Sequence, residues 1–201
     1  MIEQGTAEWV KARVGMLTAS RMADAMAFTK TGEGAARRKL KRDILAERLV
    51  GAAVDHYVSD AMQWGLDHEQ AAKDAFEAAT GELLLPAGFV EHPHIQFLGA
   101  TPDALLDHDG IAEFKCPTTA THLDYLLAGK VPAEYKPQMV AQMLCTRRRW
   151  GVFCSFDPRL PPKQQLFVRR YEPAPEEFAE VESAAVKFLA EVDAMWEQIH
   201  S

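Results

Sequence analysis

Residues 99–117 read GATPDALLDHDGIAEFKCP, and this stretch decides the fold because it contains two short strands and a tight turn. Residues 103–107 and 111–116 are short and rich in apolar side chains, which is typical of paired strands. The residues His108-Asp109-Gly110 between them predict a three-residue hairpin loop with glycine in the left-handed conformation. Such a loop predicts three cross-strand pairs, which are Asp107 with Ile111, Leu105 with Glu113, and Asp103 with Lys115.

This pairing gives the hairpin one charged face and one apolar face. Because side chains alternate between the faces of a strand, Asp103, Glu113 and Lys115 fall on the same side. The opposite face is uniformly apolar and consists of Ala104, Leu106, Ala112, Phe114 and Cys116. A two-residue loop would move Asp103 to the other face, so the prediction depends on the register.

Two carboxylates and a lysine on one face are suited to hold Mg²⁺ against a phosphodiester. Magnesium prefers oxygen ligands, keeps several waters and usually takes one or two carboxylates from protein. Asp103 and Glu113 supply these, the backbone carbonyl of Phe114 is a candidate third oxygen, and a second ion would share Asp103. Lys115 would orient or help to deprotonate the attacking water and stabilise charge on the phosphate.

The alternative is an ordinary surface hairpin. In that case Asp103 and Lys115 form a cross-strand ion pair that contributes little stability. A D…ExK pattern has many accidental occurrences. These residues alone therefore leave the two interpretations open.

The composition is that of an ordinary globular protein. The 201 residues are 48% hydrophobic and 25% charged, which suits one domain over residues 1–201. No apolar run approaches membrane-spanning length, and the start, MIEQGTAEWVKAR, lacks a secretion signal. Cys116, Cys145 and Cys154 are widely spaced, so we expect buried free thiols in a reducing, cytoplasmic compartment.

The charge of the chain is unevenly distributed. A net charge of −7 and a pI near 5.5 weigh against a general binder of polyanions. Basic residues nevertheless concentrate near the start, namely Lys11, Arg13, Lys30, Arg37, Arg38, Lys39, Lys41 and Arg42. Such a patch can grip phosphates on an acidic protein, although a cluster of this kind is more often a solvated helix face.

Hydrophobic periodicity and turn signals predict the other elements. We expect helices over residues 7–14, 19–27, 35–50, 59–80, 119–127, 133–147 and 176–199, with a mobile loop over residues 28–34. We expect strands over residues 83–90, 96–100, 103–107, 111–116, 150–156 and 164–171. Helices on either side of a central mixed β-sheet define an α/β fold.

Three further carboxylate and amide side chains are candidates for the site. Glu69 lies in the helical segment QWGLDHEQAAKDAFE, from which it would aim a third carboxylate at the metal; alone, it is more simply an exposed helix residue. Gln138 and Gln142 are one helical turn apart and would contact a substrate phosphate or the nucleophilic water. Surface amides at this spacing are also common, so that alternative stays open.

An anion pocket is predicted near the start of the chain. Arg13 and Ser20 flank the turn VGMLTAS, which leads into a helix N-terminus. Backbone N–H groups, a hydroxyl and a guanidinium would together suit a terminal phosphate. The competing interpretation is that Thr18 and Ser20 are only helix caps.

Taken together, these segments resemble the lambda exonuclease / YqaJ-type viral recombinase family within the PD-(D/E)xK nuclease superfamily. The resemblance runs roughly from Glu8 to Pro158, and its blocks stand in the family's order: EWVKARVGMLTAS, QWGLDHEQAAKDAFE, GATPDALL, IAEFKCP, EYKPQMVAQM and FDPRL. It implies a restriction-endonuclease-like core. It also implies a metal-dependent exonuclease that degrades one strand of duplex DNA from its 5′ end to mononucleotides and leaves 3′ single-stranded tails.

The resemblance also assigns roles to individual residues. Asp103, Glu113 and Lys115 match the family's catalytic triplet, Glu69 its helix carboxylate, and Gln138 the glutamine that follows the triplet. The positions that match the family's pocket for the 5′ phosphate are Arg13, Ser20 and Thr101. Met62 falls where an apolar wedge parts the terminal base pair, and Lys30 where a loop reaches the DNA.

The resemblance further implies cofactors and partners. We expect two Mg²⁺ ions, with Mn²⁺ as a substitute, a ring of three subunits around the DNA, a phage single-strand annealing protein as partner, and no membrane contact. Three positions depart from the family: Thr101 replaces a serine, Thr121 replaces an arginine, and Gln142 stands where a tyrosine is frequent. The rival functions are a structure- or sequence-specific endonuclease and a non-catalytic DNA-binding subunit.

Overall fold

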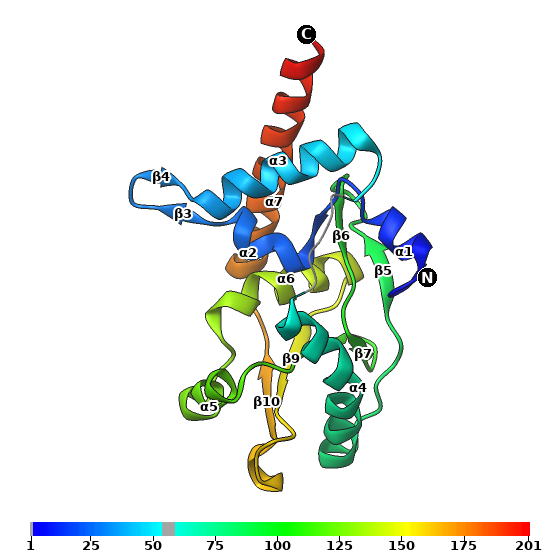
Figure 1. The fold of residues 1–201 in the computed structure, drawn as a ribbon, viewed down its shortest axis with the longest axis vertical. Helices are drawn as coiled ribbons and strands as arrows, with labels where there is room; N and C mark the ends of the chain where they lie inside the picture. Colours follow the sequence, from blue (N-terminus) through cyan, green and yellow to red (C-terminus); the bar gives the residue numbers. More distant parts are fainter. Residues whose placement is uncertain (1, 54–58) are drawn as a thin grey trace.

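Short strands alternate with helices along the chain (Figure 1). The computed structural model describes residues 2–53 and 59–201. The elements of the first half are β1 (Ile2–Glu3), α1 (Ala7–Ala12), β2 (Leu17–Thr18), η1 (Ala19–Arg21), α2 (Met22–Ala25), β3 (Phe28–Thr29), β4 (Gly32–Glu33), α3 (Ala35–Val50), α4 (Asp60–Thr80), β5 (Gly88–Glu91) and β6 (Leu98–Ala100). Those of the second half are β7 (Ala104–Leu106), β8 (Gly110–Lys115), α5 (Thr119–Ala128), η2 (Ala133–Tyr135), α6 (Lys136–Thr146), β9 (Trp150–Phe156), η3 (Pro162–Gln164), β10 (Leu166–Tyr171) and α7 (Pro175–His200).

The helices α3 and α4 begin and end at the capping residues that the sequence provides. The Ser59 side chain accepts a hydrogen bond from the Met62 N–H and starts α4. Gly51 and Gly81 end α3 and α4 in the left-handed conformation that C-terminal caps favour. The predicted extents of both helices are confirmed.

The expected mixed sheet flanked by helices is confirmed, and its strands are divided between two four-stranded sheets. Their strand orders are β1-β5-β6-β2 and β10-β9-β8-β7, and each contains one parallel pair, β2 with β6 and β8 with β9. The chain leaves the first sheet at Pro102, which has no N–H to donate to a strand ladder. A single bridge between Leu85 and Leu105 links the segment before β5 to the second sheet.

Several predicted elements differ in type or extent from the structure. The expected helix over residues 19–27 is a 3-10 turn followed by the short α2, and the expected loop over residues 28–34 contains the β3–β4 hairpin, which projects from the body as an arm in Figure 1. The strand expected from residue 83 begins only at Gly88, because Pro86 interrupts the ladder.

The β10-β9-β8-β7 sheet is covered on both faces. On one face, α4 buries Ala72 and Phe76, whose ring meets Phe114 edge-on at 5.8 Å between centroids. On the other face, Ile111 and Phe153 join the larger core formed with α2, α3, α6 and α7. The predicted apolar face of the hairpin is therefore confirmed, and all three cysteines are buried and free, as predicted.

The register of the β7–β8 hairpin differs from the prediction by two residues. Leu105 pairs with Ile111 and Leu106 with Gly110, so the loop comprises residues 107–109. Asp107, with φ 44°, adopts the left-handed conformation that was expected of the glycine. Gly110 instead lies within β8, where a Cβ would come within 2.4 Å of the ring of Trp150.

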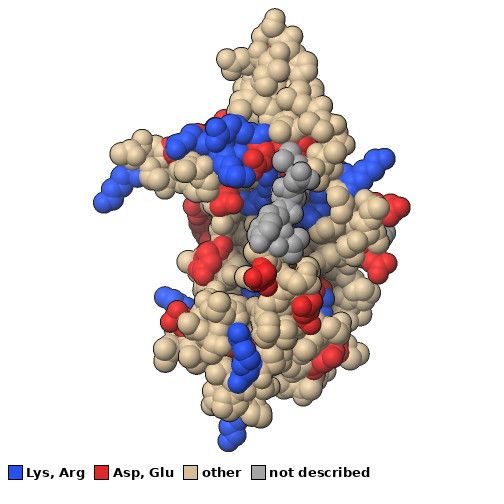
Figure 2. Space-filling model, viewed as in Figure 1, with Lys and Arg blue, Asp and Glu red and all other residues tan. Residues whose placement is uncertain are grey.

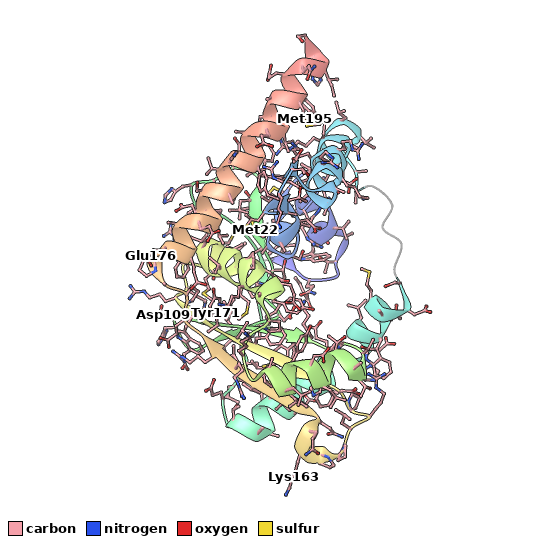
Figure 3. The ribbon with its side chains drawn as sticks, turned by 90° about the vertical axis from the view of Figure 1, so that its left-hand side faces the viewer. Met22, Asp109, Lys163, Tyr171, Glu176 and Met195 are labelled. Atoms are coloured by element: carbon pink, nitrogen blue, oxygen red, sulfur yellow. The ribbon has the colours of Figure 1, made fainter. Side chains whose placement is uncertain are left out.

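Because the shift is an even number of residues, it leaves every side chain on its predicted face. The turn lies at the end of the sheet where β10 finishes, as the neighbouring labels of Asp109 and Tyr171 show in Figure 3. Consistent with this, the N–H groups of Arg149 and Trp150 donate to the carbonyl of Asp109. Lys115 therefore lies at the opposite end of the sheet.

No helix within the described residues is long and apolar enough to cross a membrane.

Candidate active site

The charged face of the β7–β8 hairpin brings three side chains together. Asp103 precedes β7, and its Oδ2 accepts a hydrogen bond of 2.7 Å from the N–H of Phe114. Glu113 and Lys115 lie two residues apart on β8, so their side chains share a face, and 2.5 Å separates Lys115 Nζ from Glu113 Oε1. Asp103, Glu113 and Lys115 line a common cavity of about 160 Å³. The surface-hairpin alternative is wrong in its pairing, because Lys115 contacts Glu113 and Glu113 is buried, with 1% of its surface exposed.

Two glutamines of helix α6 donate hydrogen bonds to the carboxylate of Glu113. Gln138 Nε2 donates to Glu113 Oε1 at 2.5 Å, and Gln142 Nε2 donates to Oε2 at 2.6 Å. Both glutamines are buried, so the surface-amide alternative does not hold. The remaining Gln142 oxygen, Oε1, is buried and has no hydrogen-bond partner among the described residues.

The local charges shift the acidity of two groups. Burial and then the negative charge of Glu113 raise the pKa of Asp103 well above its usual value, although Lys115 opposes them. Burial alone would lower the pKa of Lys115, but the carboxylates of Glu113 and Asp103 outweigh it and raise the pKa above its ordinary value. The site thus brings two carboxyl groups and one ammonium group together in one cavity.

The donor set fits a hard divalent cation. Asp103 and Glu113 bring two carboxylates to one cavity, which matches the small number of protein ligands that Mg²⁺ usually takes. Among the described residues, no group of three or more His, Cys, Asp and Glu side chains is arranged to hold a metal ion. The role of the Phe114 carbonyl stays a prediction.

A second cavity opens beside the first. This cavity of about 420 Å³ is lined by Asp103 and Lys115 and, from α4, by Met62, Leu66 and Glu69. Glu69 is paired with Lys73 on its own helix, with 2.7 Å between Nζ and Oε1. The structure therefore brings Glu69 and Met62 to the edge of the candidate site, where Glu69 forms an ion pair with Lys73.

The predicted anion pocket opens into the smaller cavity. Arg13, Ser20 and Thr101 line the same 160 Å³ cavity as Asp103 and Glu113. Ser20 lies within η1 and its Oγ is 3.2 Å from Thr18 Oγ1, while Thr18, at the N-cap position, makes no side-chain cap bond. Burial, and then the positive charge of Arg21, lower the pKa of Arg13.

Trp9 was not among the predicted site residues. It lines the same cavity, its Nε1 donates to Thr101 Oγ1 at 2.9 Å, and the guanidinium of Arg13 lies 3.8 Å from the centroid of its ring. Thr101 is 92 positions away in the chain, and Trp9 itself resembles a core residue of a short helix. Its spacing of four residues from Arg13 was the one available signal.

Two predicted residues lie apart from the cavities. Lys30 is exposed in the turn of the β3–β4 arm, away from the cavity residues. Thr121 belongs to the first turn of α5, where its N–H donates to Thr118 Oγ1 at 3.3 Å. Thr118 is therefore the N-terminal cap of α5, and Thr121 is the residue whose N–H it accepts.

Figure 2 shows how charge is distributed on one face. Blue side chains gather over the region of α2 and α3, whereas red side chains are scattered across the lower part. Several cations of this cluster are paired: Arg37 and Lys41 with Glu33 and Glu191, and Lys39 with Asp43. Three of the eight basic residues of the early cluster, Arg37, Lys39 and Lys41, thus form salt bridges among the described residues.

Comparison with known proteins supplies a family and solved relatives. Residues 8–149 match the model of the YqaJ-like viral recombinase domain. The chain is 39% identical to an alkaline exonuclease, LHK-Exo, from Laribacter hongkongensis, covering 97% of this chain and 96% of that one with a TM-score of 0.89. LHK-Exo in complex with dAMP gives 40% identity, coverage of 96% of both chains and the same TM-score of 0.89.

A more distant structure shares the fold. A phage related exonuclease from Haemophilus somnus 129PT is 15% identical, covering 92% of this chain and 96% of that one with a TM-score of 0.67. At this identity the likeness concerns the fold alone. No curated protein matches the chain.

Proposed function

Because the chain belongs to the YqaJ-like viral recombinase domain family, we propose that it is a Mg²⁺-dependent 5′→3′ exonuclease of linear double-stranded DNA, formed by one nuclease domain over residues 1–201. A phage-type exonuclease and recombinase function follows from that family and from the similarity to alkaline exonucleases. The observation that carries the finer proposal is the shared cavity. This cavity contains the carboxylates of Asp103 and Glu113 and also Arg13, Ser20 and Thr101. The last three residues form what is called the phosphate pocket below.

The hydrolytic half of the site is assigned to the hairpin and α6. Asp103 and Glu113, with the carbonyl of Phe114, would hold the metal, which supplies charge stabilisation at the phosphate and a more acidic water. Gln138 donates to Glu113 and keeps its carboxylate oriented. The ammonium group of Lys115 lies beside Glu113. From there it would orient the attacking water and offset the charge that develops on the phosphate.

The phosphate pocket supports the 5′→3′ direction. A guanidinium and hydroxyls bind a dianionic terminal phosphate better than an internal phosphodiester, because the terminal group carries more charge and more acceptor oxygens. A 5′ phosphate held by Arg13, Ser20 and Thr101 would place the next phosphodiester towards Asp103. Cleavage there releases a 5′-mononucleotide, which has the chemistry of the dAMP that LHK-Exo binds.

The α4 wall and the arm complete the proposed DNA contacts. Met62 is 54% exposed and lines the second cavity with Asp103, a place suited to an apolar wedge against the terminal base pair. Glu69 would orient water or metal from the same wall, and Lys30 would reach the duplex from the exposed β3–β4 turn.

The proposal extends to assembly and cellular role. We assign two Mg²⁺ ions that share Asp103, with Mn²⁺ as a substitute, and a homotrimeric ring that encloses the duplex. The 3′ tails would pass to a phage single-strand annealing protein in the bacterial cytoplasm. Family membership supports these assignments, and light scattering of the purified protein tests the ring, which predicts three times the mass of the 22.4 kDa chain.

The decisive experiment uses one linear duplex labelled separately at each end. With Mg²⁺, we expect acid-soluble label first from the 5′ end, and none in EDTA. Early release from the 3′ end would contradict the polarity. Absence of any Mg²⁺-dependent release would support the non-catalytic DNA-binding alternative instead.

Closed circular plasmid separates the exonuclease from an endonuclease with the same site. An exonuclease needs an end, so we expect the circle to stay intact and to be degraded only after linearisation. Nicking or linearisation of the circle would favour the structure- or sequence-specific endonuclease. Asp103→Asn in the same assay controls for contaminating nucleases.

A further inference from the structure

One side chain, Trp9, contacts two of the three residues of the phosphate pocket. Its indole Nε1 donates to Thr101 Oγ1 at 2.9 Å, and its ring lies 3.8 Å from the guanidinium carbon of Arg13. We propose that Trp9 is a positioning residue that sets the 5′-phosphate preference by orienting both groups. This inference rests on the proposed function of the pocket.

The contact with Thr101 fixes the direction of a proton. An indole N–H can only donate, so the Thr101 hydroxyl must act as acceptor towards Trp9. The hydroxyl still has one proton, and among the described residues no acceptor for it is found. Because Trp9 occupies one lone pair, the Thr101 O–H is directed away from the indole and remains available to a phosphate oxygen. The β-branched side chain of threonine adds stiffness about χ1.

The contact with Arg13 places a guanidinium over the face of the indole. Stacking on an aromatic face leaves the N–H donors of arginine pointing outwards in the plane of the group. Side-chain hydrogen bonds and salt bridges of Arg13 are absent from the part of the chain that the structure describes, so these donors are uncommitted. The charge of Arg21 disfavours a second cation at this place, whereas the charge of Glu47 favours it. The negative face of the indole adds a further attraction for the guanidinium.

Trp9 belongs to the first turn of α1. The backbone N–H of Trp9 donates to the side chain of Thr6, which caps the helix. The indole N–H at the edge of the ring contacts Thr101, whereas the face of the ring contacts Arg13. The two contacts can therefore be removed separately by substitution. Trp9→Phe keeps an aromatic face and removes the N–H, whereas Trp9→Leu removes both.

The measured quantity is the end preference, defined as kcat/KM on a 5′-phosphorylated duplex divided by kcat/KM on the same duplex with a 5′-hydroxyl. We expect Trp9→Phe to lower this ratio about fivefold, the size of effect that one ordinary hydrogen bond produces. Trp9→Leu should lower it by more than about tenfold, because the stacking contribution is also lost. Cleavage of the 5′-hydroxyl duplex should fall by less than cleavage of the 5′-phosphorylated duplex in both variants.

A double-mutant cycle tests whether Trp9 acts through Thr101. If it does, Trp9→Phe adds no further loss to Thr101→Ala, and the double variant matches Thr101→Ala within about twofold. Independent effects would multiply instead and contradict the proposed route. Binding of the two duplexes without divalent metal, measured by fluorescence anisotropy, provides a readout that does not depend on cleavage.

Trp150 offers a matched control. The guanidinium of Arg170 lies 3.7 Å from its ring, so Trp150→Phe alters a stacked tryptophan–arginine pair outside both cavities. This variant should keep the wild-type end preference. Thermal unfolding of every variant identifies any general loss of structure.

The outcomes separate two failures. If the wild type lacks a preference for 5′-phosphorylated ends, the proposed function of the phosphate pocket fails, and the role of Trp9 fails with it. If the wild type and Arg13→Ala behave as proposed but folded Trp9 variants keep the preference, only the present inference is overturned. An equal loss on both duplexes in Trp9→Leu also overturns it.

Discussion

Gln142 donates a hydrogen bond of 2.6 Å to the Oε2 atom of Glu113, and both side chains are buried. The other oxygen of Glu113 is held by Gln138 and Lys115, so the carboxylate is fixed at both ends. The resemblance of the sequence to the family implies that a tyrosine is frequent at the position of Gln142. A phenol and a primary amide share the ability to donate one hydrogen bond.

Substitution of Gln142 tests this clamp. We expect Gln142→Leu to lower kcat by about 10- to 100-fold and to raise the Mg²⁺ concentration that is required, because Glu113 loses one of its orienting donors. Gln142→Tyr should recover part of the loss. A Mg²⁺ titration of activity, with unfolding measured in parallel, checks both. Wild-type kcat and Mg²⁺ dependence in Gln142→Leu would contradict the role.

Asp103→Asn should abolish cleavage without harming the fold. The pKa of Asp103 is raised by burial and by Glu113, so its ionised carboxylate is unfavourable in the metal-free protein, and a neutral amide removes that repulsion. We expect the melting temperature of the variant in EDTA to equal or exceed that of the wild type. Added Mg²⁺ should then stabilise the wild type but not Asp103→Asn. A variant that Mg²⁺ stabilises equally would show that Asp103 is not a ligand.

Asp157 predicts a pH dependence of stability. Its carboxylate is fully buried, and its pKa is lowered to about 2 because bonds from Arg159 and Thr119 outweigh the burial that would raise it. A lowered pKa stabilises the folded state above the unfolded value near 4 and loses that contribution as the pH falls towards 2.

The corresponding variant is Asp157→Asn. Near pH 7 we expect it to reduce the free energy of unfolding by about 2 kcal/mol, and the difference from wild type should fall to roughly half at pH 3. Urea unfolding at pH 7, 5 and 3 measures this. A difference that is constant across that range would show that the ionised form of Asp157 contributes nothing.

Met62→Ala tests the wedge. We expect it to slow degradation of a blunt duplex severalfold and to have less effect on a duplex whose first base pairs are mismatched, since those need no separation. Leu127→Ala is a suitable control, because Leu127 is 86% exposed on α5 and lines neither cavity. Equal slowing of both substrates by Met62→Ala would rule out strand separation as its role.

The sequence predicted the parts of the fold that depend on local chemistry. Caps at Ser59, Gly51 and Gly81 set the limits of α3 and α4, and the alternation of apolar residues set the two faces of the β7–β8 hairpin. The division into two sheets was not predicted, because it depends on where the chain turns after β6, and a proline shows only that a ladder stops.

The missed features of the site depend on contacts between distant segments. Trp9 and Thr101 are 92 positions apart, and no local pattern records their hydrogen bond. The burial of Gln142 against Glu113 likewise depends on how α6 docks on the sheet. The turn of the hairpin was misassigned because Gly110 was read as a conformational requirement, whereas it makes room for Trp150.

The two-residue offset in the β7–β8 pairing defines what this hairpin can tolerate over evolutionary time. If one strand slides by an even number of residues, the cross-strand partners change but Asp103, Glu113 and Lys115 stay on one face of the hairpin. A slide by an odd number would place charged side chains on the face that packs against Phe76. A shift of the pairing by two residues therefore leaves the charged face intact, whereas a shift by one residue would invert the two faces. Parity along the strands is what selection must preserve.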